Sequence, residues 1–245
     1  MNGSSKFTWG AEMLETRDLT LHYGGSQILN GVSLTAPKGQ VTCVMGTNGV
    51  GKTSLMKAIA GTHARSGGDV ILNGQVLPKL PAHRLAQMGV GYVPQGRMIF
   101  PLLTVRENLE TGLACLPKAE RVVPERIFEM FPVLKEMQNR RGGDLSGGQQ
   151  QQLAIGRALV ARPKLLLMDE PTEGIQPNII QLIGRVIEQL RAEGEMAIVL
   201  VEQYFDFAYA LADRFHVLSR GATVFAAAKA DTTREAVQGA FSLKG

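Results

Sequence analysis

Cysteine, long apolar runs and a strong excess of one charge are all scarce in this sequence. Its 245 residues include only two cysteines, Cys43 and Cys115, too few for a disulfide framework, and their surroundings lack a metal-type spacing of cysteine and histidine. A reducing, cytoplasmic setting is therefore the default expectation. No apolar run reaches the roughly 18–20 residues that a membrane-spanning helix needs, and residues 1–6 do not resemble a secretory signal.

The charge balance is mild. Lysine and arginine number 26 against 22 aspartates and glutamates, which gives a net charge of +4. Such weak basicity suits contact with nucleotide phosphates, lipid headgroups or nucleic acid and selects none of them. Hydrophobic residues make up 44% of the chain and charged residues 20%, which is typical of a globular protein with a buried core.

Strand and helix patterns alternate through most of the chain. Short apolar runs over residues 41–45, 165–168 and 197–201 predict buried strands. Residues 52–60 predict a helix, and the spacing of apolar residues from Ile179 to Leu190 predicts one face of another. Because strands alternate with helices, we expect an α/β fold with a parallel sheet that carries helices on its faces.

The N-terminal part and the middle of the chain follow other patterns. We expect residues 1–12 to form a loose extension. Residues 14–23 partly alternate as in a half-buried strand, and Asn30-Gly31 predicts a turn. Helix capping boxes beginning at Thr104 and Ser146, among several prolines, indicate a small helical insertion over about residues 97–160.

Residues 46–53, Gly-Thr-Asn-Gly-Val-Gly-Lys-Thr, match the phosphate-loop motif at every fixed position. The loop lies between a predicted buried strand and a predicted helix, which is the context that the motif requires. Its glycines let backbone N–H groups face phosphate oxygens, and the helix N-terminus favours the same negative charge. We expect Lys52 to contact the β- and γ-phosphates and Thr53 to offer its hydroxyl to Mg²⁺. The candidate nucleotide-binding residues here are Gly46, Thr47, Asn48, Gly49, Val50, Gly51, Lys52, Thr53 and Ser54.

Two carboxylates, Asp169 and Glu170, end the apolar run Leu165-Leu-Leu-Met168. An aspartate at such a strand end holds Mg²⁺ in phosphoryl-transfer proteins, and a neighbouring glutamate can take a proton from the attacking water. Paired with a phosphate loop, they predict Asp169 as a metal residue and Glu170 as the general base.

The stretch Leu145-Ser-Gly-Gly-Gln149 stands 20 residues before Leu165. A capping box explains Ser146 and Gln149 but does not require Gly147 and Gly148. With the phosphate loop and the acidic pair, this stretch resembles the signature of the ATP-binding cassette (ABC) ATPases, and the resemblance covers about residues 13–245. It implies a P-loop NTPase (RecA-like) core with a mostly parallel sheet, an N-terminal antiparallel β subdomain and an inserted α-helical subdomain.

The resemblance also implies the roles of further residues. Tyr23 falls where an aromatic ring stacks on adenine, although a tyrosine of the core or sheet surface is the alternative. Gln95 matches a catalytic glutamine that contacts Mg²⁺ and the attacking water. In the family, two cassettes pack head to tail around ATP and Mg²⁺. The signature residues Ser146, Gly147, Gly148 and Gln149 would therefore contact the nucleotide of a partner chain.

Two positions depart from the common family pattern. Gln203 stands where most members carry a histidine that contacts the γ-phosphate, and it would take that catalytic place here. Its amide donates hydrogen bonds but cannot carry a proton as an imidazolium does. Gln176 stands where the loop after the acidic pair usually has an aspartate. These changes leave open whether the chain hydrolyses ATP well or mainly binds it.

Residues 141–153, 169–177 and 201–207 resemble the ATPases of branched-chain amino-acid and amide uptake, and most closely the urea branch. The expected function is ATP hydrolysis coupled to urea import, with branched-chain amino acids as the alternative substrate. The implied partners are a second, different cassette or a second copy, transmembrane permease subunits and, indirectly, a periplasmic binding protein. The implied location is the inner face of the plasma membrane. ABC-type ATPases that act on DNA carry long coiled coils, and only 50 residues separate Gln95 from Leu145, so we expect no nucleic-acid partner.

Overall fold

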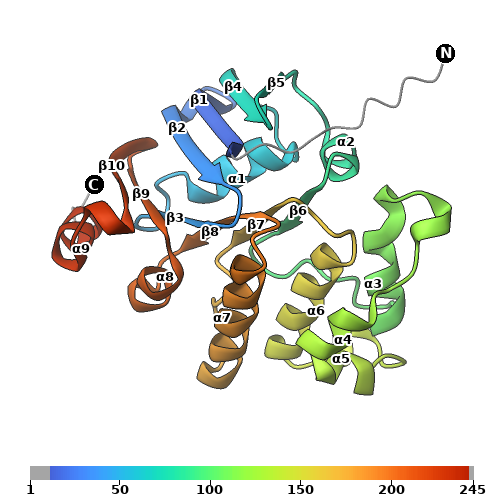
Figure 1. The fold of residues 1–245 in the computed structure, drawn as a ribbon. Coiled ribbons are helices and arrows are strands. Elements are labelled where there is room, and N and C mark those ends of the chain that lie inside the picture. Colours follow the sequence, from blue (N-terminus) through green and yellow to red (C-terminus); the bar gives the residue numbers. More distant parts are fainter. Residues whose placement is uncertain (1–11, 243–245) are drawn as a thin grey trace, which may run out of the picture.

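The structure is a computed structural model that describes residues 12–242, in which a central sheet lies between a smaller sheet and a set of helices (Figure 1). The strands are β1 Glu12–Tyr23, β2 Ser26–Pro37, β3 Val41–Met45, β4 Gly67–Leu72, β5 Gln75–Leu77, β6 Val90–Val93, β7 Leu165–Asp169, β8 Ala197–Glu202, β9 Arg214–Ser219 and β10 Ala222–Ala228. The α-helices are α1 Lys52–Ala60, α2 Ala82–Gln87, α3 Val105–Gly112, α4 Glu125–Met130, α5 Pro132–Glu136, α6 Gly147–Leu159, α7 Pro177–Ala192, α8 Phe205–Leu211 and α9 Arg234–Ser242.

The central sheet has the strand order β10-β9-β3-β8-β7-β6 and is parallel except for β10. Every residue of β3, β7 and β8 is buried, which explains why their sequences are apolar runs without alternation. The predictions of a mostly parallel sheet and an α/β fold are confirmed. Because β3 and β7 both pair with β8, their carboxyl ends meet at one edge of the sheet.

The smaller sheet is antiparallel, with the order β2-β1-β4-β5. The predicted turn at Asn30-Gly31 is wrong, since both residues lie inside β2. Asn30 pairs with Thr20 and Val32 with Leu19. Gly31 is therefore an extra, bulged residue, and its φ of 77° suits glycine. Of the predicted extension, Glu12 belongs to β1, and residues 1–11 lie outside the described residues.

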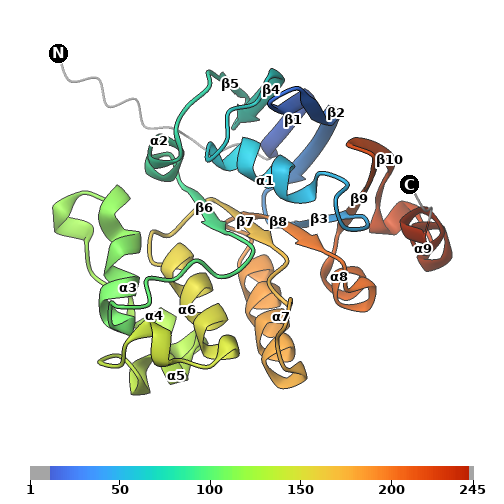
Figure 2. The same cartoon turned by 180° about the vertical axis from the view of Figure 1, so that it is seen from behind.

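Helices α3 to α6 fill the interval between β6 and β7 and lie on the opposite side of the central sheet from the smaller sheet (Figures 1 and 2). Both predicted capping boxes are present, Thr104 with Glu107 at α3 and Ser146 with Gln149 at α6. Neighbouring residues of β7 face different cores. Leu166 and Met168 pack with α6 and α7, whereas Leu165 and Leu167 pack with α1 and the smaller sheet.

Asn108 of α3 fixes the segment that follows β6. It is fully buried, and its side-chain oxygen accepts a hydrogen bond from the backbone N–H of Phe100 at 2.8 Å. Its amide nitrogen donates to the carbonyl oxygens of Phe100, Leu103 and Thr104 at 2.9, 3.2 and 2.9 Å. One side chain thus fixes the path of the chain from Gln95 into the helices.

We expect Asn108→Ala to lower the free energy of unfolding by about 2–3 kcal/mol, because it leaves several backbone groups without their hydrogen-bond partner. Urea denaturation followed by circular dichroism measures the change. The control Glu110→Ala, which breaks an exposed ion pair to Arg106 on the same helix, should change stability by less than about 0.5 kcal/mol. Equal effects of the two substitutions would contradict the role of Asn108.

Candidate functional site

The phosphate loop joins the end of β3 to the start of α1 and wraps tightly against the rest of the protein. Gly51 is the N-cap of α1 and has a φ of 105°. A Cβ at Gly51 would lie 2.9 Å from a methyl of Leu29, and one at Gly46 would lie 2.5 Å from the carbonyl oxygen of Leu218. Both glycines are therefore required by the path of the loop, as well as by any close approach of phosphate.

The N-terminus of α1 suits an anion. No side chain caps it, and its first turn contains no acidic residue, so its free N–H groups face the loop. The Lys52 side chain is 4% exposed, and its ammonium donates to the carbonyl oxygens of Gly46 and Thr47 at 2.9 and 3.0 Å. A buried cation beside an uncapped helix start fits the phosphates of a nucleotide.

Asp169 lies beside this loop, at the end of β7. Its Oδ1 accepts a hydrogen bond from the Thr53 hydroxyl at 3.3 Å. Its Oδ2 is buried and has no hydrogen-bond partner within residues 12–242. Burial, together with the nearby Glu170 carboxylate, raises the pKa of Asp169 to about 6 despite the bond from Thr53. An unpartnered carboxylate oxygen next to a hydroxyl is a donor set that fits Mg²⁺.

Glu170 is the point where the predicted catalytic groups meet. Its Oε1 lies 3.2 Å from the Lys52 ammonium, and its Oε2 accepts hydrogen bonds from the side-chain amides of Gln95, at 3.4 Å, and of Gln203. Glu170 has a left-handed backbone with a φ of 49°, a conformation that non-glycine residues adopt mainly where the surroundings impose it. The three predicted partners come from α1, from the loop after β6 and from the loop after β8.

Lys52, Thr53, Gln95 and Glu170 line one open cleft of about 410 Å³, which is large enough for a small-molecule ligand. Tyr23, at the end of β1, lines the same cleft and is 40% exposed. Its ring contacts the His63 ring with centroids 4.4 Å apart. The exposed face of Tyr23 is thus available to a flat ligand, while His63 supports the ring.

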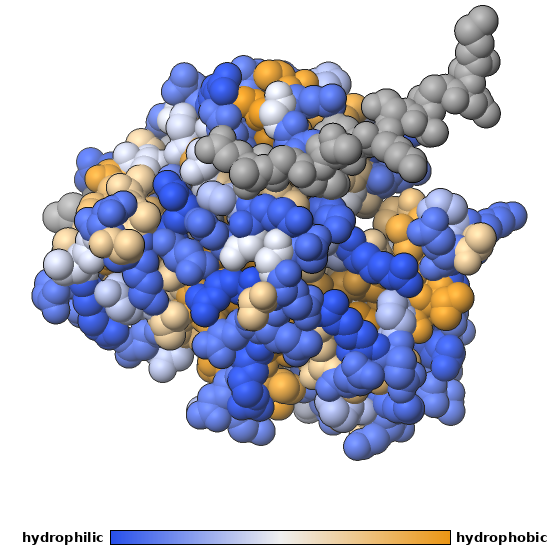
Figure 3. All heavy atoms as spheres, in the orientation of Figure 1, coloured by the Kyte–Doolittle hydropathy of each residue, from blue (hydrophilic) through white to orange (hydrophobic). Residues whose placement is uncertain are grey.

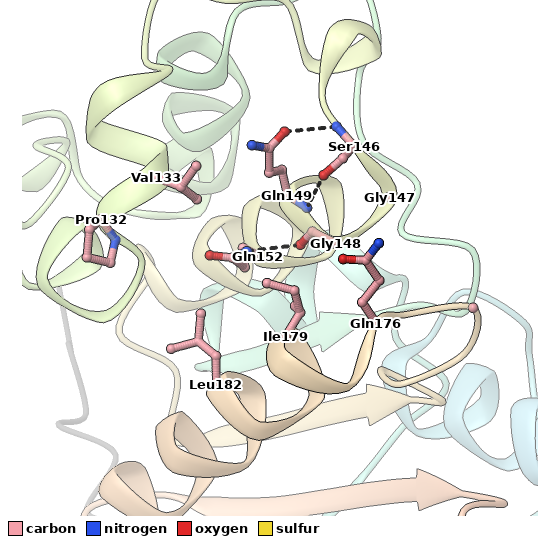
Figure 4. A pocket seen from close by; sticks show the side chains of 11 residues that line it. Pro132, Val133, Ser146, Gly147, Gly148, Gln149, Gln152, Gln176, Ile179 and Leu182 are labelled. Atoms are coloured by element: carbon pink, nitrogen blue, oxygen red, sulfur yellow. Dashed lines mark hydrogen bonds between the residues drawn. The ribbon is translucent and has the colours of Figure 1, made fainter.

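The signature residues lie in a different cleft, at the start of α6 (Figure 4). The Ser146 hydroxyl accepts from the N–H of Gln149 at 3.4 Å, and the Gln149 side chain accepts from the N–H of Ser146 at 2.9 Å. Gln176 and Ile179, from the start of α7, face this helix end across the cleft. Among residues 12–242, none lines both clefts, so a single chain brings together the phosphate loop and acidic pair but not the signature.

Four residues around these clefts were not singled out from the sequence. Glu173 accepts from the Gln95 amide at 3.0 Å, and Arg97 lies against Gly147 and donates to Gln150 at 3.4 Å. Thr172 and the buried Glu202 are hydrogen-bonded to each other. No local pattern marks these residues, because each acts through a contact between segments that are distant in the sequence.

The raised pKa of Asp169 predicts a pH-dependent stability in the absence of nucleotide and metal. Between about pH 4, near the ordinary value of 3.8, and pH 6 the folded state binds the extra proton, so stability falls as the pH rises through this window. We expect Asp169→Asn to raise the free energy of unfolding by about 1–3 kcal/mol at pH 7.5 and to have little effect at pH 4. Urea denaturation at both pH values measures this.

The exposed Asp231→Asn is the matched control, and we expect it to change stability by less than about 0.5 kcal/mol at either pH. A destabilising Asp169→Asn at pH 7.5 would contradict the assignment of a burial penalty to Asp169.

Known proteins resemble the chain in sequence and structure. Residues 29–173 match the family model described as ABC transporter. The chain is 42% identical over 213 residues to the "High-affinity branched-chain amino acid transport ATP-binding protein BraG" of Pseudomonas aeruginosa, which covers 86% of this chain and 91% of the relative. It is 37% identical over 216 residues to the "Probable branched-chain amino acid transport ATP-binding protein LivF" of Archaeoglobus fulgidus, with 87% and 91% covered.

Among solved structures, a dimeric ATP-binding cassette in a post-hydrolysis state, bound to ADP and Pi, superposes with a TM-score of 0.78 at 25% identity. The match covers 89% of this chain and 99% of that chain. Within residues 12–242, no helix is both long and apolar enough to cross a bilayer. The family match, the two relatives and the shared fold show that this chain belongs to the ABC transporter family, as one of its ATP-binding ATPase cassettes.

Proposed function

We propose that this chain hydrolyses ATP as the energy-coupling subunit of an importer of branched-chain amino acids or of a small amide such as urea. One observation carries the proposal: Lys52, Gln95 and Gln203 meet at the Glu170 carboxylate beside the phosphate loop, and the neighbouring Asp169 is bonded to Thr53 of that loop. The convergence of three side chains from separate segments on one carboxylate supports hydrolysis over binding alone.

Different residues of this chain bind different parts of the nucleotide and its Mg²⁺ ion in this proposal. The loop N–H groups and the start of α1 bind the phosphates, and Lys52 exchanges its loop carbonyls for phosphate oxygens. Tyr23 stacks on the adenine. Thr53, Asp169 and Gln95 would hold Mg²⁺, which when bound supplies positive charge that offsets the charge of the phosphates. Asp169 Oδ2 is the oxygen still free for this purpose.

Glu170 is the general base of the proposed reaction. Once Lys52 turns to the phosphates, the Glu170 carboxylate is left with the two glutamine amides and is able to accept a proton from the attacking water. Gln95 and Gln203 orient this carboxylate, and Gln203 offers its amide to the γ-phosphate in the place that a histidine takes in most of the family. A neutral amide at this position does not change its charge near pH 7.

The other half of each nucleotide site comes from a second cassette. Within the described part of the chain, the signature cleft and the phosphate cleft share no lining residue, and one related cassette is a dimer. Both facts support a head-to-tail pair in which Ser146, Gly147, Gly148 and Gln149 contact the partner's nucleotide. The partner is a second, different cassette or a second copy of this chain.

Transmembrane permease subunits are the other proposed partners, with a periplasmic binding protein acting through them at the outer face. Hydrophobic residues are exposed after the Gln95 loop, with Met98 67%, Phe100 49% and Leu102 79% exposed. Hydrophilic residues cover most of the face in Figure 3, and a hydrophobic area lies at its right, over the helical segment. The exposed Met98, Phe100 and Leu102, which follow the Gln95 loop in the sequence, support docking of the permease there, at the inner face of the membrane.

Of the two substrate classes, the comparisons with known proteins support branched-chain amino acids better than urea. The names of the two relatives favour branched-chain amino acids. The stretches 141–153, 169–177 and 201–207 favour urea through their resemblance to that branch. No residue of a cassette touches the transported solute in this proposal, so transport has to be measured directly.

We expect Glu170→Gln to lower the rate of ATP hydrolysis by at least about 100-fold, because it removes the general base. Binding of ATP should persist and should trap a dimer that gel filtration detects. Glu188→Gln, an exposed change on α7, is the control and should retain wild-type turnover. Unchanged turnover in Glu170→Gln would mean that Glu170 is not the general base.

Uptake of labelled leucine and labelled urea, in cells whose only copy carries Glu170→Gln, tests the transport proposal. We expect uptake of one solute to be lost while the Glu188→Gln cells retain it. Loss of leucine uptake alone assigns the chain to amino acids, and loss of urea uptake alone assigns it to urea. Retention of both, with the variant protein present at normal levels, would contradict a role in importing either solute.

A further inference from the structure

Gln203 has to be held in place by the protein around it. An amide has to direct its N–H groups correctly to donate to Glu170, and Gln203 is only half-buried. It follows the last residue of β8, in a short segment between that strand and α8. Whatever fixes the backbone of this segment also fixes the direction of the Gln203 amide.

Glu202 fixes this segment from inside the protein. It is 2% exposed, and its Oε2 accepts hydrogen bonds from the backbone N–H groups of Gln203 and Tyr204 at 3.1 and 3.3 Å. Bonds from two consecutive N–H groups to one oxygen hold the turn that leads from β8 into α8. The path of the backbone at Gln203 therefore depends on the Glu202 carboxylate.

The second oxygen of Glu202 binds the loop that carries the general base. Its Oε1 accepts from the backbone N–H of Thr172 at 3.2 Å and from the Thr172 hydroxyl at 2.8 Å. Thr172 lies two residues after Glu170, whose own N–H donates to the carbonyl oxygen of Val201 at 2.9 Å. One side chain thus joins the Glu170 loop to the Gln203 segment.

Glu202 is well suited to this role because its carboxylate is the acceptor in each of these hydrogen bonds. Burial raises its pKa, and the bonds from Thr172, Tyr204 and Gln203 oppose that rise. A carboxylate accepts at both oxygens, whereas a glutamine side chain in the same place has one oxygen and one NH₂ group. Glutamine would therefore direct N–H groups at the donors of one of the two loops.

We propose that Glu202 is a positioning residue for ATP hydrolysis, which joins the Thr172 and Gln203 backbones and thereby aims the Gln203 amide at the Glu170 carboxylate. The inference rests on the proposed function of the chain as an ATPase. Glu202 is bonded to Thr172 and to the backbones of Gln203 and Tyr204 rather than to the Glu170 carboxylate, so in this proposal its effect on the reaction passes through the direction of the Gln203 amide.

The first test is a double-mutant cycle on purified full-length protein. We expect Glu202→Gln to lower kcat about tenfold, as the loss of a buried hydrogen-bonding acceptor would, while the affinity for ATP stays within about twofold. We expect Gln203→Ala by itself to slow hydrolysis with ATP affinity nearly intact, and in this background the further loss from Glu202→Gln should be less than about twofold. An equal fold-loss in both backgrounds would overturn the proposal, because Glu202 would then act independently of Gln203.

Thr172 supplies a matched pair of milder variants. Thr172→Val keeps the shape of the side chain but removes the hydroxyl that donates to Glu202, whereas Thr172→Ser keeps the hydroxyl. We expect Thr172→Val to lower kcat by a few-fold and Thr172→Ser to restore it. This pair tests the proposal even if Glu202→Gln does not fold, and similar rates in the two variants would count against it.

Hydrogen exchange in nucleotide-free protein gives a readout that does not depend on activity. The amides of Gln203 and Tyr204 should exchange faster in Glu202→Gln than in the wild type. Thr16→Val is the control, since it removes another buried hydroxyl with two backbone bonds, in the smaller sheet, and should leave exchange at these amides unchanged. Unchanged exchange in Glu202→Gln would overturn the proposal.

The two proposals fail in different ways. Absence of ATP turnover by the wild-type protein, alone and with its partner subunits, would contradict the proposed function. The exchange measurement would then still show whether Glu202 holds the two loops together.

Discussion

The parallel pairing of β3, β8 and β7 is the constraint on which the site depends. In a parallel sheet all carboxyl ends lie at the same edge, so the register brings Met45, Glu202 and Asp169 to that edge. The phosphate loop, the Gln203 segment and the acidic pair follow directly from these strand ends. Both faces of the strands are buried by separate cores, which holds the edge rigid while the loops beyond it are free to bind and release ligands.

Much of this arrangement was predictable from the sequence because it depends on residues that are close together along the chain. The runs at residues 41–45, 165–168 and 197–201 become the three central strands, since burial on both faces requires continuous apolar residues. The capping boxes at Thr104 and Ser146 need only contacts over three residues. The phosphate-loop spacing likewise lies within one short segment.

The rest depends on contacts between distant segments. In the sequence, Asn30-Gly31 resembles a turn. Only the pairing of β1 with β2 on both sides of Gly31 shows that this residue is a bulge within a strand. The folded chain also brings together residues that are distant in the sequence, such as His63 with Tyr23 and Thr172 with Glu202. No local sequence pattern predicts these contacts. The identity of the transported solute could not be predicted from this sequence, because in the proposed function the chain contacts the nucleotide and the permease subunits rather than the solute.

Several polar groups of the phosphate loop and of the signature already have partners within the chain, and this has a thermodynamic consequence for the proposed assembly around ATP. Lys52 already binds its own loop and Glu170, and Ser146 already bonds Gln149. In the proposed assembly around ATP, one set of polar contacts would therefore be exchanged for another, and the net gain in free energy would be much smaller than the number of new contacts suggests. A modest net gain in free energy would make this assembly easy to reverse. Loss of the γ-phosphate contacts would then favour separate chains that regain their internal hydrogen bonds.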